Sequence, residues 1–382
     1  MDKVVLSSII DLISGGTPKT SHPEYWENGN IGWLSVNDFN NNDRFVYDSE
    51  KKITQEGVKN SSTKYLECGD IIISARGTVG ALAQIGTPMC FNQSCFGIRA
   101  KKDKTTNDYL YYALKNYVKN IQRKGQGSVF NTINLASFDL MEIEIPKDVT
   151  EQQKIASVLS SLDKKIELNN KINKELEAIA KTLYDYWFVQ FDFPDSNKMV
   201  YNKELKREIP DGWEVKYIKN LLNVITGKED ANFATESGKY PFFTCAETIS
   251  YCDKYAFDGK AILIAGNGNF NVKFYNGKFN AYQRTYILIP DDIRYYSIIF
   301  YAVKDQLQRL STGSAGSIIK FITKSDVENI SLVLPSNGYE NLFEKLNNII
   351  ELIENNKQQN QELSTLRDWL LPMLMNGQVK VK

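Results

Sequence analysis

Apolar residues recur at alternating steps of four and three over two long stretches of the chain, which is the spacing of helices that pack along a single seam. The first seam reads Ile155, Leu159, Leu162, Ile166, Asn169, Asn173, Leu176, Ala180, Leu183 and Trp187. The second reads Leu342, Leu346, Ile349, Ile353, Asn356, Asn360, Leu363, Arg367, Leu370 and Leu374. Two asparagines interrupt both seams at the same places, so the chain contains the same helix twice.

A helix with an apolar stripe must bury that stripe, and each copy offers the other a matching surface. The asparagines lie at the midpoint of each seam, so antiparallel packing would bring Asn169, Asn173, Asn356 and Asn360 together. Buried asparagines cost stability but fix the register and the choice of partner. We therefore expect an antiparallel pair. A parallel pair would also match the copies, and asparagines facing solvent at a loosened mid-seam are the plainer alternative.

The repeat extends into the segments between the helices. Gly69–Ile98 aligns with Gly259–Leu288 at a constant offset, and the matches include Ile72 with Ile262, Ala75 with Ala265 and Gln93 with Gln283. Further matches are Tyr112 with Tyr301, Gly127 with Gly316, Ile133 with Ile322 and Pro146 with Pro335. "MEIEIP" and "ISLVLP" both alternate as half-buried strands do.

The predicted fold class is α+β, a tandem repeat of two mixed α/β domains separated by two long antiparallel coiled-coil helices with pseudo-two-fold symmetry. The predicted segments are a first domain at 1–150, a first helix at 151–190, a connector at 191–210, a second domain at 211–338 and a second helix at 339–376.

Composition narrows the class of protein. The 382 residues are 42% hydrophobic and 12% aromatic, which suffices for real cores. No apolar run is long enough to cross a membrane, and "MDKVVLSSIIDLISGG" is interpreted as a first helix and not a signal peptide. Five cysteines without a C-x-x-C pair favour reduced thiols in a cytoplasmic protein, with Cys90 and Cys95 in a core.

Sites for catalysis or metals are not recognisable. The single histidine, His22, lies in a loop sequence without a nucleophile motif, and one histidine with scattered cysteines does not supply a zinc site. A phosphate-binding loop and an amino-methyltransferase signature are absent, and "AGNGNF" is interpreted as a turn. We therefore predict no catalytic and no metal-binding residues.

Net charge is zero, which argues against binding nucleic acid through overall charge. Basic residues nevertheless gather at matched places, between Arg99 and Lys124 and between Arg294 and Lys324. Each segment alone is most simply a solvated helix face. On a helix predicted at 109–124, Lys115, Lys119 and Arg123 share one face, which suits DNA phosphates.

Polar loops also occupy matched positions, and their side chains can recognise base edges. "KGQGSVFNTIN" offers Lys124, Gln126, Ser128 and Asn131, and "STGSAGSIIKFIT" offers Ser314, Ser317 and Lys320. Arg76 suits guanine, whereas its counterparts Asn267 and Asn269 suit adenine. The candidate DNA-binding residues are completed by Lys19, Gln93, Gln283, Arg284 and Lys304. Any one of these loops could be merely exposed. Together they indicate two DNA readers of one kind with different targets.

The order of reader domain and helix, repeated twice, resembles the specificity (S) subunit of type I restriction-modification systems. The stretches "PKDVTEQQKIASVLSSLDKKIELNNK", "YDYWFVQFDFPD" and "IPDGWEV" are similar to that family as well. The resemblance implies two target recognition domains that bind a bipartite double-stranded DNA sequence, one half-site each. It also implies helices that dock two methyltransferase (M) subunits, and motor-nuclease (R) subunits that join the complex.

By the same resemblance the chain is catalytically inert and carries no cofactor, and S-adenosylmethionine, ATP and Mg²⁺ belong to its partners. Two alternatives remain: the recognition part of a single-chain restriction or modification enzyme, and a coiled-coil assembly protein that does not bind DNA. The first would need methyltransferase motifs, and the second would not need matched basic segments. One departure from symmetry is Arg367, which occupies the seam position that Ala180 holds in the first copy.

Overall fold

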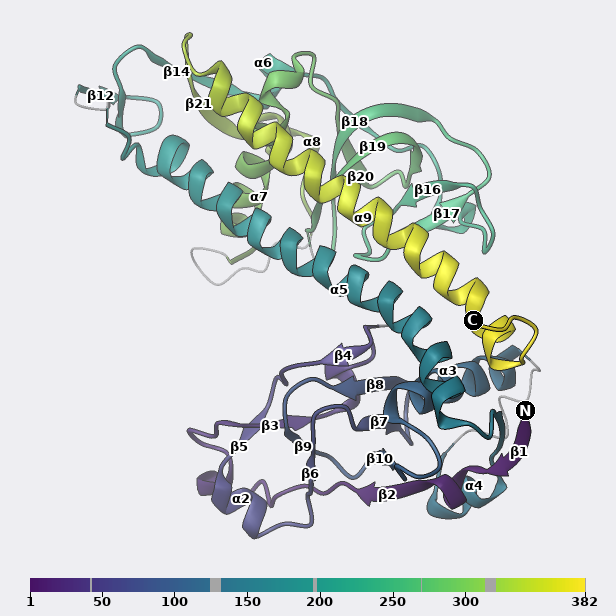
Figure 1. The fold of residues 1–382 in the computed structure, drawn as a ribbon. Helices are drawn as coiled ribbons and strands as arrows, with labels where there is room; N and C mark the ends of the chain where they lie inside the picture. Colours follow the sequence, from purple (N-terminus) through teal and green to yellow (C-terminus); the bar gives the residue numbers. More distant parts are fainter. Residues whose placement is uncertain (42, 124–131, 195–197, 269, 313–320, 382) are drawn as a thin grey trace. The chain divides into compact units, whose positions relative to one another are not determined.

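The computed structural model describes residues 1–381 except 42, 124–131, 195–197, 269 and 313–320, and the side chains at 123 and 308–312 are also outside the description (Figure 1). The chain divides into two compact units. Unit 1 comprises Met1–Asn169 with Gln359–Lys382, and unit 2 comprises Asn170–Gln358. Each unit therefore contains one mixed body of strands and short helices together with part of both long helices.

Unit 1 is built on a five-stranded sheet in the order β2-β10-β7-β8-β4, a four-stranded sheet in the order β5-β3-β9-β6, and the pair β1-β11. Its strands are β1 (Asp2–Val5), β2 (Ile10–Ser14), β3 (Ile31–Leu34), β4 (Phe45–Val46), β5 (Lys52–Ile53), β6 (Tyr65–Leu66), β7 (Ile71–Ser74), β8 (Leu82–Ile85), β9 (Met89–Phe91), β10 (Cys95–Ala100) and β11 (Glu142–Ile145). Its shorter helices are α1 (Leu6–Ile9), α2 (Gln55–Lys59), α3 (Asn107–Arg123) and α4 (Leu135–Leu140), with 3₁₀ turns at Pro23–Tyr25 and Val36–Asp38.

Unit 2 has a six-stranded sheet in the order β15-β20-β18-β19-β16-β17 and the pairs β14-β21 and β12-β13. Its strands are β12 (Met199–Asn202), β13 (Arg207–Pro210), β14 (Trp213–Tyr217), β15 (Val224–Thr226), β16 (Tyr240–Phe243), β17 (Ser250–Cys252), β18 (Phe257–Ala265), β19 (Val272–Ala281), β20 (Thr285–Leu288) and β21 (Ser331–Pro335). Its shorter helices are α6 (Ile218–Leu221), α7 (Tyr296–Thr312) and α8 (Lys324–Glu328), with 3₁₀ turns at Ala231–Phe233 and Ile293–Tyr295.

The two bodies share a common set of core strands, as the aligned sequences predict, although their sheets differ in size. The order β2-β10-β7 in unit 1 corresponds to β15-β20-β18 in unit 2, and the pair β1-β11 corresponds to β14-β21. In both units all of these neighbouring strands are antiparallel. The duplicated sequence therefore forms a duplicated fold.

The long helices are α5 (Val149–Tyr184), which continues as a π-helical segment at Asp185–Gln190, and α9 (Glu340–Met375). Within each unit they run antiparallel. In unit 1 the buried Asn169 amide donates to Gln359 Oε1 and Asn360 Oδ1, both at 2.8 Å. In unit 2 the Asn356 amide donates to Asn173 Oδ1 at 2.8 Å. The antiparallel prediction is confirmed, and the alternative in which the asparagines face solvent is wrong.

Two expectations about local structure are wrong. The first segment is not one helix: β1 and β2 flank the single turn α1, because Val4 and Leu12 pair in register with β11 and β10. β21 is also not half-buried. Alternation holds in β11, but residues 332–335 are all buried because both faces of β21 are covered.

Each unit has its own buried core, to which the long helices contribute. In unit 1, Ile155 and Leu159 of α5 and Leu371 of α9 join the same hydrophobic cluster as α3. Cys90 and Cys95 are buried, as predicted, and burial raises the pKa of the Cys90 thiol to about 11. No helix within the described ranges has the length and hydropathy that a bilayer crossing requires.

Candidate nucleic-acid interface

In unit 1, three segments meet at one end of the sheet that contains β2, β10 and β7. The Gly16 amide donates to Phe91 O at 3.0 Å, the Ala75 amide to Ser94 O at 2.8 Å, and the Ile133 amide to Ala75 O at 2.9 Å. The close approach requires glycine at position 15, because a Cβ there would lie 2.1 Å from Asn92 O. We call the surface formed by residues 15–19, 75–80 and 92–94 the unit 1 rim.

Three predicted DNA-binding residues lie on the unit 1 rim. Lys19, Arg76 and Gln93 are all exposed, and the Thr17 hydroxyl donates to Gln93 Oε1, which links two of the segments. Arg76 begins a turn in which Gly77 and Gly80 have φ values of +75° and +89°, a conformation that favours glycine. No described residue makes a hydrogen bond or an ion pair with the Arg76 side chain. The rim thus presents a guanidinium and an amide to solvent.

Unit 2 forms the equivalent rim from residues 227–230, 266–268 and 283–284. The Gly227 amide donates to Thr285 O at 3.1 Å, the Gly266 amide to Arg284 O at 2.9 Å, and the Ile322 amide to Gly266 O at 2.8 Å. These bonds join the same segments as in unit 1. The fold therefore gathers one set of loops at the same end of each sheet.

The side chains on the unit 2 rim differ from those on the unit 1 rim. Gln283 and Arg284 are exposed, and the Gln283 amide donates to Asp230 Oδ1 at 2.8 Å. Asn267 is half-buried and forms an isolated β-bridge with Phe321, whose side chain is 62% exposed. Phe321 was not among the predicted residues. The signal for it is the only aromatic residue in the loop sequence "STGSAGSIIKFIT".

The lysines of α3 have partners inside unit 1. Lys119 Nζ lies 3.2 Å from Asp368 Oδ2 of α9. Lys115 is half-buried, with Nζ 3.5 Å from the Tyr111 hydroxyl, and burial together with the charge of Arg367 lowers its pKa to about 8. The helical face predicted to be open to phosphates thus packs toward α9 at these two positions. Lys304, the counterpart of Lys115 in unit 2, is exposed.

The remaining predicted residues cannot be placed. Lys124, Gln126, Ser128, Asn131, Asn269, Ser314, Ser317 and Lys320, and the side chain of Arg123, lie outside the described residues. Among those that are described, no three histidine, cysteine, aspartate or glutamate side chains are grouped so as to hold a metal ion.

A buried polar network lies between α3 and the long helices of unit 1. Asp163 of α5 accepts from Arg367 Nη1 of α9 at 2.7 Å and from the Tyr112 hydroxyl of α3. Arg44 donates to the Tyr112 hydroxyl at 3.0 Å and to Ser160 Oγ at 2.6 Å. The Asp163 and Arg367 side chains are 4% and 9% exposed. The network therefore fixes α3, and with it the body of unit 1, against its helix pair.

A family model described as "Type I restriction modification DNA specificity domain" matches residues 1–178 and 210–365, one match in each repeat. The chain belongs to this family. Specificity subunits are the non-catalytic members of type I systems, whose catalytic activities reside on other subunits. The predicted family is confirmed.

Relatives support this assignment, and a solved structure shares the fold. The chain is 31% identical to the type I restriction enzyme MjaIX specificity subunit of Methanocaldococcus jannaschii, over 99% of the chain and 93% of that protein. It is 39% identical to the Escherichia coli EcoDI specificity subunit over 45% of the chain and 40% of that protein. Its fold matches the crystal structure of a type I S subunit from M. genitalium with a TM-score of 0.58 and 16% identity, covering 98% and 95% of the two chains.

Proposed function

We propose that the chain recognises a bipartite double-stranded DNA target, with one half-site read by each unit and an unread spacer between the half-sites. The observation that carries this proposal is the pair of rims. Both are built from equivalent loops joined by equivalent backbone hydrogen bonds, yet they present different side chains. A duplicated scaffold with divergent exposed side chains is what two readers of different sequences require.

The residues of the two rims suit direct reading of base edges. On the unit 1 rim, Arg76 can donate two hydrogen bonds to guanine and Gln93 can pair with adenine. On the unit 2 rim, Asn267 and Gln283 offer amides, and Arg284 offers a guanidinium. Lys19 and Lys304 are exposed and suit backbone phosphates. Phe321 could contact a thymine methyl group or enter a base step.

The long helices supply the second part of the proposal, which is the docking of two M subunits. Helix α5 leaves Leu168, Ile172 and Ile179 between 39% and 50% exposed, and α9 leaves Leu366 and Trp369 at 43% and 57%. Apolar side chains of this size on a helix surface are typical of a protein interface. We propose that R subunits join the resulting complex, and that S-adenosylmethionine, ATP and Mg²⁺ bind to these partners and not to this chain.

Exchange of one reader tests the proposal. Residues 211–338 are replaced by the second domain of another family member, and the methylated sites of cells that express the chimera with its M subunit are mapped. We expect one half of the recognised sequence to change and the other half to stay. The reciprocal exchange of residues 1–150 is the matched control, and it should change the opposite half. A change in both halves from either exchange would contradict one reader per unit.

A further inference from the structure

The two candidate readers share a turn that follows equivalent strands. In unit 1 it comprises residues 76–80 between β7 and β8, and in unit 2 it comprises residues 266–268 and 270 between β18 and β19 (Figure 1). We call each of them a reading turn, because Arg76 begins the first and Asn267 lies in the second. Hydrogen bonds to base edges depend on direction, so a side chain can discriminate between bases only if its turn is held in place.

Ser74 holds the reading turn of unit 1 from inside the hairpin. Its side chain is fully buried, and its hydroxyl donates to Thr78 O and accepts from the Ala81 amide at 2.8 Å. The Ser74 carbonyl accepts from the Gly80 amide at 3.0 Å. The turn also approaches α3 closely, because a Cβ at Gly80 would lie 2.9 Å from Val118 Cγ1. We call Ser74 the unit 1 lock.

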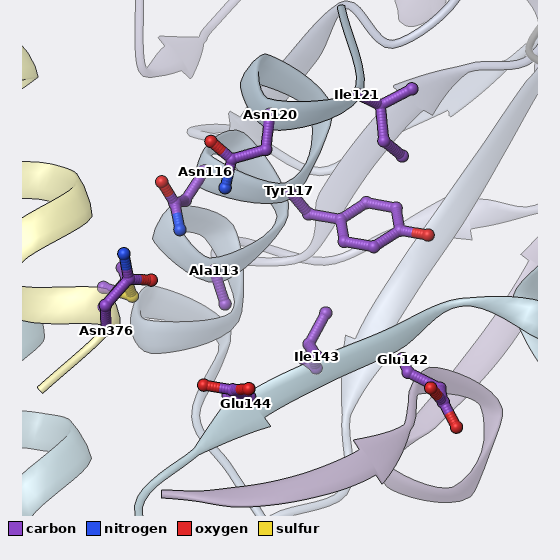
Figure 2. A pocket seen from close by; sticks show the side chains of 10 residues that line it. Ala113, Asn116, Tyr117, Asn120, Ile121, Glu142, Ile143, Glu144 and Asn376 are labelled. Atoms are coloured by element: carbon purple, nitrogen blue, oxygen red, sulfur yellow. The ribbon is translucent and has the colours of Figure 1, made fainter. Parts of the chain in front are cut away.

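A polar cavity of unit 1 takes no part in this lock. It lies between α3 and β11 and has a volume of about 290 Å³ (Figure 2). Asn116, Glu144 and Asn376 line it, but no residue of the reading turn does. Substitutions in the cavity therefore change unit 1 without changing the contacts of the turn, which makes them useful as controls.

Unit 2 holds its reading turn from outside the hairpin. The Asn271 side chain donates to Cys245 O at 2.8 Å and accepts from Lys273 Nζ. Lys273 Nζ also donates to Ala246 O at 2.7 Å. Burial lowers the pKa of the Lys273 ammonium, as is typical of a cation enclosed between two segments. These bonds tie the turn to the segment that follows β16, and we call Asn271 and Lys273 the unit 2 lock.

The sequences of the two turns explain why the locks differ. At the end of the turn, unit 1 has Gly80 with a φ of +89°, whereas unit 2 has Phe270 with a φ of +47°. A bulky residue persists in this conformation only where the surrounding structure imposes it. Ile264 occupies the repeat position of Ser74 and offers no hydroxyl for this purpose. The unit 2 lock supplies the constraint from the other side of the turn.

The unit 2 lock also connects the reading turn to the rest of the unit 2 rim. Cys245, whose carbonyl the lock bonds, donates from Sγ to Arg284 O at 3.6 Å. The Gly266 amide of the turn donates to the same carbonyl at 2.9 Å. Loss of the lock should therefore displace the two candidate readers Asn267 and Arg284 together.

We propose that Ser74 and the pair Asn271 and Lys273 are positioning residues for base recognition, an inference that rests on the proposed function. Each lock acts through the readers that it holds, which are Arg76 in unit 1 and Asn267 with Arg284 in unit 2. The two locks have no residue in common. The base preference of each half-site therefore depends on the lock of its own unit and is independent of the other.

The test measures DNA methylation by the full-length chain with its M subunit, on targets in which each base of both half-sites is varied in turn. Ser74→Ala should lower the preference for the cognate base about tenfold at one or more positions of the unit 1 half-site, which is within the discrimination of one bidentate contact. The unit 2 half-site should be read as before. Lys273→Met should have the reverse effect. General destabilisation would instead lower the methylation of every target together.

Conservative variants and matched controls separate a lock from a merely structural residue. Ser74→Thr and Lys273→Arg keep the hydrogen-bond donors and should retain most of the preference that the first two variants lose. Asn116→Ala removes a nearly buried polar side chain of unit 1 at the cavity. Lys278→Met removes an exposed lysine of β19 whose ammonium lies 4.6 Å from the centre of the Tyr255 ring. Both controls should leave every base preference unchanged.

Unchanged preferences in Ser74→Ala and Lys273→Met, or relaxation of both half-sites by either variant, would overturn the inference. If Ser74→Ala does not fold, Ser74→Cys takes its place with the same expectation, because a thiol of similar volume is a weaker donor and acceptor. The domain exchange tests the proposed function separately. Half-sites that it does not assign to single units would refute the two readers, whereas assigned half-sites that both lock variants read as before would refute the locks alone.

Discussion

The two units pack the long helices together at equivalent positions, but unit 1 uses a buried ion pair where unit 2 uses apolar side chains. At one layer of the helix pair, unit 1 has Asp163 and Arg367, whose side chains form a buried ion pair at 2.7 Å. The repeat-equivalent residues of unit 2 are Ile350 and Ala180, which are buried in one hydrophobic cluster. The helix pair therefore accommodates either an ion pair or two apolar residues at this layer. The ion pair, however, requires both charged residues to be present.

A tyrosine next to this layer also makes different contacts in the two units. In unit 1 the Tyr112 hydroxyl donates to Asp163. Its counterpart Tyr301 stacks on Tyr184, with ring centres 5.7 Å apart. One tyrosine thus acts through its hydroxyl and the other through its ring. A substitution at this layer should therefore have different consequences in the two units.

The largest effect is expected from Asp163→Ala. It leaves the Arg367 guanidinium buried without its main partner and removes the acceptor of Tyr112, and breaking a buried pair typically costs about 3–5 kcal/mol. Urea unfolding should show this loss of stability. Ile350→Val, at the equivalent position of unit 2, is the control, with an expected cost of about 0.5–1.5 kcal/mol. A loss below about 1 kcal/mol for Asp163→Ala would show that solvent reaches this layer.

An intermediate effect is expected when the unit 2 solution is transplanted into unit 1. The double substitution Asp163→Ile with Arg367→Ala removes both charges together, and apolar replacement of a buried pair is often neutral or stabilising. The double variant should therefore be at least about 2 kcal/mol more stable than Asp163→Ala. A double-mutant cycle gives the coupling energy of the pair. Simple additivity of the two single substitutions would disprove the coupling.

The smallest effect concerns Lys115 and depends on pH. Burial lowers its pKa from 10.5 to about 8, so between these values the unfolded chain binds more protons than the folded chain. Stability should therefore rise as the pH increases from 8 to 10.5. Lys115→Met should abolish the rise and stabilise the protein at pH 7. The expected gain is about 1–2 kcal/mol, which is smaller than the full pKa shift implies because solvent screens a half-buried ammonium.

Lys304→Met provides the matched control for Lys115, because Lys304 occupies the same repeat position but is exposed. Its effect should stay within about 0.5 kcal/mol at every pH. Thermal unfolding of both variants between pH 7 and pH 10.5 makes the comparison. Parallel pH profiles for the parent chain and Lys115→Met would show that the ammonium remains solvated.

The sequence was most informative where its pattern was long and repeated. Two heptad seams with matched asparagines predicted both helices and their antiparallel pairing, because periodicity over many turns leaves few alternatives. The structure of short segments was harder to predict. The first residues pair with β10 and β11, which are more than 80 positions away, and a local pattern does not reveal such partners. The local pattern of β21 likewise did not reveal that both of its faces are covered.

Candidate site residues were only partly predictable. Their position in the repeat indicated equivalent loops in the two units, but it did not reveal that these loops gather at one end of each sheet. Helical spacing placed Lys115 and Lys119 on one face, but it did not reveal that this face packs toward α9. Arg44 carried no signal at all, because its burial depends on Gln84, Tyr112 and Ser160 from three separate segments.

The ionic layer also restricts which helices can pair. Each layer contains one residue from each repeat, so two identical copies of either helix could in principle associate with one another. Two copies of α5 would then place Asp163 against Ala180, and two copies of α9 would place Ile350 against Arg367. Either arrangement buries a charge without a partner, which costs several kcal/mol. Divergence at these two positions thus disfavours self-association of each half and commits the two halves of one chain to each other.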